Sequence, residues 1–129
     1  MSEVKRIDVN RIAGSVVTYL QVATGDCAGE YLRMLRSNDK YVSKEMLRRW
    51  KEARARPRMS PFDEHGWVAD YLFNDPDWCA DLAGDRICQL MQLPYGDPDF
   101  ENLFDEVCEA LARKMPWVKD AMLAMRHGS

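Results

Sequence analysis

The fold class is decided by the stretch Asp97-Pro98-Asp99-Phe100-Glu101-Asn102-Leu103-Phe104-Asp105-Glu106-Val107-Cys108-Glu109-Ala110-Leu111-Ala112. Counted from Phe100, apolar residues recur 3, 4, 7, 8, 11 and 12 positions later, which places them on one face of an α-helix. The Asp-Pro-Asp start is typical of a helix N-terminus, because Asp caps free N–H groups and Pro fits the first helical position. We therefore predict a core helix that Asp97 opens.

Similar three- and four-residue spacing of apolar residues covers most of the chain. Capping residues precede several of these segments, among them Asp8, Ser43, Ser60 and Asp75. The first helix is predicted to end at Thr24-Gly25, since glycine favours helix ends. The expected helices cover residues 9–23, 27–36, 44–56, 61–73, 76–92, 98–114 and 116–125.

No segment alternates apolar and polar residues with period two, and no Asn-Gly or Asp-Gly turn joins two apolar runs. The sequence thus predicts an all-α fold, a compact bundle of six or seven short helices without a sheet. We expect a single domain over residues 1–129, with residues 126–129 as a tail. The connections are short, as expected within one bundle.

Charge is strongly segregated along the chain. Residues 44–58 have seven bases against two acids, a net charge of +5. Residues 59–112 have thirteen acids against one base, a net charge of −12. The net charge of −3 for the whole chain hides this contrast.

Six of the acids form two rows in which consecutive members lie four residues apart: Asp77, Asp81, Asp85, and Glu101, Asp105, Glu109. On a helix such a row repeats about every 6 Å along one face, and no lysines are interleaved to compensate the like charges. We predict that these faces bind a protein partner, one with a basic, nucleic-acid-binding surface. The alternative is that both rows are ordinary solvated faces, with the first acids favoured by the helix N-terminus.

The expected function is non-catalytic capture or inhibition of that partner, as by a small inhibitor, an immunity protein or a phage counter-defence protein. The chain has no Gly-rich phosphate loop, no Gly-x-Ser-x-Gly elbow and no histidine pair at metal-binding spacing. His65 follows two acids, but neighbours in sequence on a helix point in different directions and cannot form a dyad. We therefore predict that the protein is not an enzyme.

The basic helix supports a second hypothesis. The segment Tyr41-Val-Ser-Lys-Glu-Met-Leu-Arg-Arg-Trp50 resembles the recognition helix of helix-turn-helix regulators and excisionases, with residues 31–37 as the preceding helix. It departs from that family in having a longer turn without glycine, at residues 37–42. The resemblance implies a DNA-binding regulator. Its contacts to the major groove or phosphates would come from Lys44, Arg48, Arg49 and Lys51, and its contacts along the DNA backbone from Arg54, Arg56 and Arg58.

The same helix also offers ion pairs of its own, from Glu45 to Arg49, Arg48 to Glu52 and Glu52 to Arg56. Its remaining bases could pair with the acidic half of the chain or with a second copy. A homo-oligomer in which the +5 and −12 segments neutralise each other is therefore a third hypothesis, and high salt would weaken it.

The cysteines, Cys27, Cys79, Cys88 and Cys108, are not paired at metal-binding spacing, so we expect neither a metal site nor a cofactor. Each lies in or beside an apolar helical pattern, where a reduced thiol behaves as a small apolar side chain. The N-terminal residues lack the apolar core of a signal peptide, and no apolar run has the length of a membrane span. We predict a cytoplasmic protein without a membrane partner.

Overall fold

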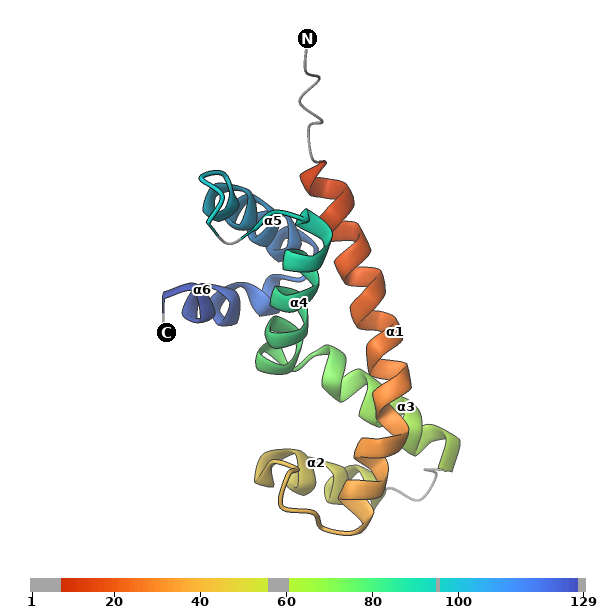
Figure 1. Ribbon diagram of the computed structural model, residues 1–129. Helices are drawn as coiled ribbons and strands as arrows, with labels where there is room; N and C mark the ends of the chain where they lie inside the picture. The colour runs from red at the N-terminus through yellow and green to blue at the C-terminus, as the bar shows by residue number, and fades with distance from the viewer. Residues whose placement is uncertain (1–7, 56–60, 95, 128–129) are drawn as a thin grey trace. The chain divides into compact units, whose positions relative to one another are not determined.

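The computed structural model describes residues 8–55, 61–94 and 96–127. Within these ranges the chain forms six α-helices, one 3-10 helix and no strand, so the all-α prediction is confirmed. The elements are α1 (Val9–Arg36), α2 (Lys44–Arg54), α3 (Pro61–Phe73), α4 (Pro76–Met91), α5 (Phe100–Lys114), η1 (Pro116–Val118) and α6 (Lys119–His127) (Figure 1).

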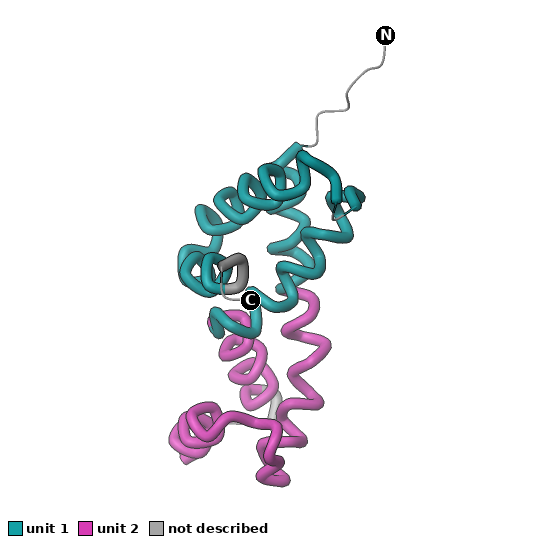
Figure 2. The backbone as a smooth tube through the Cα atoms, turned by 60° about the vertical axis from the view of Figure 1, so that its left-hand side comes forward, with its two compact units in different colours: residues 1–20, 75–129 teal, residues 21–74 magenta. Residues whose placement is uncertain are grey.

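The chain divides into two compact units (Figure 2). Unit 1 comprises residues 1–20 and 75–129, and unit 2 comprises residues 21–74. The single domain over residues 1–129 stays a prediction. α6 ends at His127, so this helix includes two residues of the expected tail, and residues 128–129 lie outside the described ranges.

α1 continues through Thr24 and Gly25, so the predicted helix end at this point is wrong. Thr24 is only 4% exposed, and its hydroxyl donates to the Gln21 carbonyl oxygen at 2.8 Å. Burial then continues at the same spacing through Ala28 and Leu32. A mid-helix glycine costs about 1 kcal/mol relative to alanine, whereas burying one leucine side chain contributes about 1.5–3 kcal/mol. Burial therefore outweighs the local stop signal.

α1 ends at Arg36, where the predicted helix 27–36 was expected to end, and α2 begins after the predicted cap. Asn38 has a left-handed backbone, with φ of 57°, and the Asp39 N–H donates to the Met34 carbonyl oxygen at 2.9 Å. This pattern is a Schellman motif, which satisfies carbonyl groups at a helix end. The Ser43 hydroxyl accepts from the Met46 N–H at 3.1 Å, so the predicted N-cap is confirmed.

The starts of α4 and α5 differ from each other. Asp75 caps α4 as predicted, since its carboxylate accepts from two N–H groups of the first turn at 3.1 and 3.3 Å. Asp97 instead accepts from the Asp99 N–H at 2.8 Å and forms a turn that precedes the helix. α5 therefore begins at Phe100, later than the Asp-Pro-Asp pattern predicted.

The core of unit 1 is built by α4, α5, η1 and α6. α4 packs against the other three, and α5 also packs against α6. Four of the seven apolar positions predicted for α5 are buried: Phe100, Val107, Cys108 and Leu111. The other three are half-buried: Leu103, Phe104 and Ala112. The predicted apolar face of this helix is thereby confirmed.

Unit 2 holds a nearly buried carboxylate, Glu64 of α3, which is 7% exposed. Arg36 of α1 donates to it from Nη2 to Oε2 at 2.5 Å. Arg54 of α2 approaches its other oxygen, with Nε 3.5 Å from Oε1. The Arg54 guanidinium also lies over the Trp50 ring, 4.9 Å from the centroid. One side chain thus joins three helices.

Gly25→Ala is expected to raise the free energy of unfolding by about 0.5–1 kcal/mol, because alanine favours a helix interior and a Cβ at this position meets nothing within 4 Å. Urea denaturation measures the change, with Gly29→Ala, also inside α1 and also unobstructed, as the control. A loss of stability at residue 25 alone would mean that α1 does not continue through it.

Glu64→Gln is expected to lower the free energy of unfolding by about 1–3 kcal/mol, because two arginines lose the charge that they share. Glu52→Gln is the matched control, since Glu52 is exposed and, among the residues that the structure describes, pairs only with Arg48, and it should cost less than about 1 kcal/mol. Equal effects of the two substitutions in urea titrations would show that Glu64 does not hold unit 2 together.

Candidate protein-binding surface

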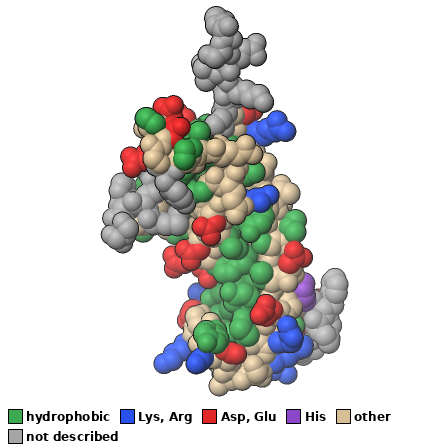
Figure 3. Space-filling view, in the orientation of Figure 1, with side chains coloured by type: hydrophobic (Ala, Val, Ile, Leu, Met, Phe, Trp, Pro, Cys, Tyr) green, Lys and Arg blue, Asp and Glu red, His purple; other side chains and the backbone are tan. Residues whose placement is uncertain are grey.

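The predicted acidic row of α4 lies on the exposed side of this helix. Its members are all exposed: Asp77, Asp81 and Asp85. The residues that face the core are buried: Cys79, Ala80, Ala83, Gly84, Ile87 and Met91. None of the three aspartates forms an ion pair with another residue of the described ranges. Figure 3 shows acidic side chains of unit 1 in red on the face that it presents.

Arg86 is the one base of the acidic stretch 59–112, and it does not neutralise this row. Its guanidinium lies over the ring of Tyr19, 4.9 Å from the centroid, and its Nη1 donates to the Gln89 amide oxygen at 3.2 Å. Within the described part of the chain Arg86 has no ion pair with a carboxylate. The three aspartates of α4 are therefore exposed and form no ion pair with Arg86 or with any other residue that the structure describes.

The predicted row on α5 is less uniform. Glu101 and Glu109 are exposed, and neither pairs with a cation among the described residues. Asp105 is half-buried and makes an interaction within the molecule. The two ends of this row are thus more available to a partner than its middle, and α4 offers the more regular surface.

The net charges of the two units differ less than those of the segments 44–58 and 59–112. Three acids of the −12 stretch, Asp63, Glu64 and Asp70, belong to unit 2. Unit 1 has thirteen acids against eight bases, a net charge of −5, and unit 2 has ten bases against eight acids, a net charge of +2. Unit 1 is therefore the acidic unit, and its net charge is larger in magnitude than that of unit 2.

Several bases of α2 already form ion pairs with carboxylates. Arg48 Nη1 lies 2.6 Å from Glu52, and its Nη2 lies 2.7 Å from Glu45. Arg49 Nε lies 2.7 Å from the same Glu45 oxygen, and Arg54 pairs with Glu64. The predicted pairs of Glu45 with Arg49 and of Arg48 with Glu52 are thus confirmed.

The other bases proposed to contact DNA are placed differently. Lys44 and Lys51 are exposed and have no ion pair with any residue that the structure describes, and Arg56 and Arg58 lie outside the described residues. The connection from α1 to α2, residues 37–43, has seven residues. A helix-turn-helix motif uses a turn of about three or four residues, so the departure noted in the sequence persists in the fold.

The cysteines and His65 lie on different helices, with His65 on α3 and the cysteines on α1, α4 and α5. Burial, with the nearby Asp75 carboxylate, raises the pKa of the Cys79 thiol to about 12, which keeps it protonated and unreactive near neutral pH. None of the four cysteines forms a disulfide. His65 is exposed on α3. In the described part of the chain, no three His, Cys, Asp or Glu side chains come together in a way that could hold a metal ion.

Similarity to known proteins does not assign a class to this surface. No protein-family model matches the chain, and no curated protein or solved structure is significantly similar to it. None of the described helices is both long enough and apolar enough to cross a membrane. The exposed carboxylates of unit 1 and the exposed lysines of α2 are thus the charged surfaces from which a function can be inferred.

Glu45 gives a direct check on the ion pairs of α2. Hydrogen bonds from Arg48 and then Arg49 lower the pKa of Glu45 from its ordinary 4.5 to about 2. Because the folded pKa lies below the unfolded value, the stabilisation is present above about pH 4.5 and is lost as the pH falls toward 2. An NMR titration of the Glu45 carboxyl carbon should show this low midpoint, and Arg48→Gln/Arg49→Gln should return it toward 4.5. A midpoint near 4.5 in the unmodified protein would contradict these pairs.

Proposed function

We propose that the protein is a non-catalytic binding protein whose acidic surface on α4 docks onto a basic surface of a protein partner. The observation that carries this proposal is the row Asp77, Asp81 and Asp85, exposed at one-turn spacing and without an ion pair to any described residue. Glu101 and Glu109 of α5 add negative charge to the same unit.

Electrostatics explains why such a row suits a basic partner. Like charges four residues apart on a helix destabilise it by about 0.2–0.5 kcal/mol per pair. A partner that brings positive charge to the row relieves this repulsion. Complementary potentials also accelerate encounter and disfavour acidic competitors. The unmatched row therefore favours a partner with regularly placed lysines or arginines.

Basic surfaces of this kind are found on proteins that bind nucleic acids, since they neutralise phosphates with Lys and Arg. Occupation of such a surface by α4 would exclude the nucleic acid by steric and electrostatic means. The protein would then act as a small inhibitor, in the manner of an immunity protein or a phage counter-defence protein. Four cysteines without a disulfide fit the reducing cytoplasm as the place of action.

The triple change Asp77→Asn/Asp81→Asn/Asp85→Asn is expected to reduce partner capture at least about tenfold, because the row loses its charge while Asp75 keeps the helix cap. The measurement is affinity capture from nuclease-treated cell lysate, with the captured protein identified by mass spectrometry. The matched control is Asp26→Asn/Glu30→Gln/Asp70→Asn, which removes three exposed acids of unit 2 and should retain capture.

A DNA-binding role would give the opposite pattern in the same experiment. Capture would then disappear with nuclease and with Lys44→Gln/Lys51→Gln, which removes the two exposed lysines of α2 that have no ion pair with a described residue. Binding to duplex DNA would also weaken steeply as salt is raised. These results would replace the proposed function with the helix-turn-helix hypothesis.

A further inference from the structure

The chain itself carries a surface that complements the acidic row of α4. On α2, Lys44 and Lys51 are exposed and form no ion pair with any residue that the structure describes. They are seven residues apart, which is about 10 Å along the helix axis. On α4, Asp77 and Asp85 are eight residues apart, which is about 12 Å. The lysines of α2 therefore match the aspartates of α4 in spacing and oppose them in sign.

Leu47 adds an apolar side chain to the lysines of α2. It follows Lys44 by three residues and precedes Lys51 by four, so the three side chains lie on one face of the helix. Leu47 is half-buried, so part of it is accessible beside the two lysines. The acids of this helix, Glu45 and Glu52, already pair with arginines. This face of α2 thus combines two positive charges with an apolar contact.

α4 has a corresponding face of the opposite charge. Trp78 and Leu82 are half-buried, whereas Asp81 and Asp85 are exposed. Trp78 precedes Asp81 by three residues, and Leu82 precedes Asp85 by three, so each aspartate neighbours an apolar side chain on the helix surface. This face thus combines two negative charges with two accessible apolar contacts.

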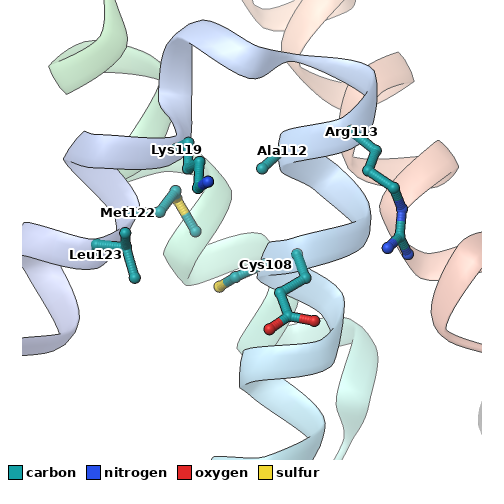
Figure 4. Close-up of a pocket in the computed structure, with 7 residues that line it drawn as sticks. Cys108, Ala112, Arg113, Lys119, Met122 and Leu123 are labelled. Atoms are coloured by element: carbon teal, nitrogen blue, oxygen red, sulfur yellow. The ribbon is translucent and has the colours of Figure 1, made fainter.

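A pocket in unit 1 differs from this face, because charges of both signs line it. The pocket has a volume of about 360 Å³ and lies between α5 and α6, with Cys108 and Met122 in its apolar lining (Figure 4). Two bases, Arg113 and Lys119, and one acid, Glu109, also line it. Mixed charges do not select an occupant of one sign, whereas the α4 row has a single sign of charge.

We infer that the acidic face of α4 also binds the basic face of α2 in a second copy of this chain. The two aspartates pair with the two lysines, and Leu47 of one copy contacts Trp78 and Leu82 of the other. The contact joins two different surfaces, so copies either close into a dimer through two such contacts or continue into a chain. Exposed ion pairs are individually weak and are screened by salt, so we expect reversible association at high protein concentration and low ionic strength.

This contact regulates the proposed function, because a second copy and the basic partner compete for the same row. That consequence rests on the proposed function, whereas the self-association does not. A partner that brings more positive charge than the two lysines of α2 displaces the second copy.

The test is sedimentation equilibrium of the full chain over a range of protein concentrations. At low salt the average mass should rise above the monomer mass as the concentration increases, and high salt should return it toward the monomer. Asp81→Lys/Asp85→Lys and Lys44→Glu/Lys51→Glu should each weaken association at least about tenfold. A mass that stays at the monomer value in low salt, or association that survives either reversal, would overturn the inference.

The two reversals combined in one chain provide a matched pair of controls. The chain with all four substitutions keeps the net charge of −3, because the reversals cancel, and it should regain self-association. Asp26→Lys/Asp70→Lys combined with Lys44→Glu/Lys51→Glu also keeps −3, but it changes exposed acids of unit 2 and should stay monomeric. Equal behaviour of these two chains would contradict the contact.

A mixture of the two double variants tests the same contact without a fourfold change. Each variant alone presents two faces of like charge, whereas the mixture again offers opposite faces and should associate. This experiment decides the question if the fourfold variant fails to fold, and a mixture that stays monomeric would count against the inference.

Lysate capture separates this inference from the proposed function. Lys44→Glu/Lys51→Glu leaves the α4 row intact and removes the competing second copy, so capture should persist or rise. Loss of capture with Asp77→Asn/Asp81→Asn/Asp85→Asn in a chain that never self-associates would support the proposed function and overturn the inference. Self-association that both reversals abolish, without capture of any partner, would support the inference and overturn the proposed function.

Discussion

Unit 2 depends on one nearly buried carboxylate that two arginines share. Glu64 takes a charge-assisted hydrogen bond from Arg36 and an ion pair from Arg54, so α1, α2 and α3 each contribute one residue. A carboxylate with so little exposure is costly unless it is paired. The packing of these three helices is therefore tied to the charge of a single side chain, and Arg54 is held between it and the Trp50 ring.

This constraint bears on function, because four arginines of unit 2 already form ion pairs within the unit. Arg36 and Arg54 pair with the nearly buried Glu64, while Arg48 and Arg49 pair with acids on the surface of α2. What remains for a partner is a pair of lysines on this helix. Unit 1 shows the reverse situation, since its α4 aspartates have no matching cation among the described residues. Unmatched charge, more than total charge, distinguishes the two surfaces.

The sequence allowed prediction of features that depend on near neighbours. The caps at Ser43 and Asp75 and the apolar face of α5 were predicted because each signal lies within a few residues of the structure it forms. The exposed α4 row was predicted for the same reason. The continuity of α1 through Gly25 was not predicted, because burial of Thr24 and Ala28 is a tertiary effect that overrides a local stop signal. Glu64 and Arg36 are 28 residues apart and give no local pattern. The pocket that Cys108, Met122 and Leu123 line also could not be predicted, because it forms only when α5 and α6 meet.

The uninterrupted course of α1 has a consequence for how the protein unfolds. Residues 9–20 of this helix belong to unit 1 and residues 21–36 to unit 2, so the units share one run of backbone hydrogen bonds. To melt one unit while the other stays folded, the helix must end within α1 and expose several unpaired N–H or carbonyl groups. A short isolated helix is also only marginally stable in water. The shared helix therefore couples the two units thermodynamically, so that loss of structure in one lowers the stability of the other.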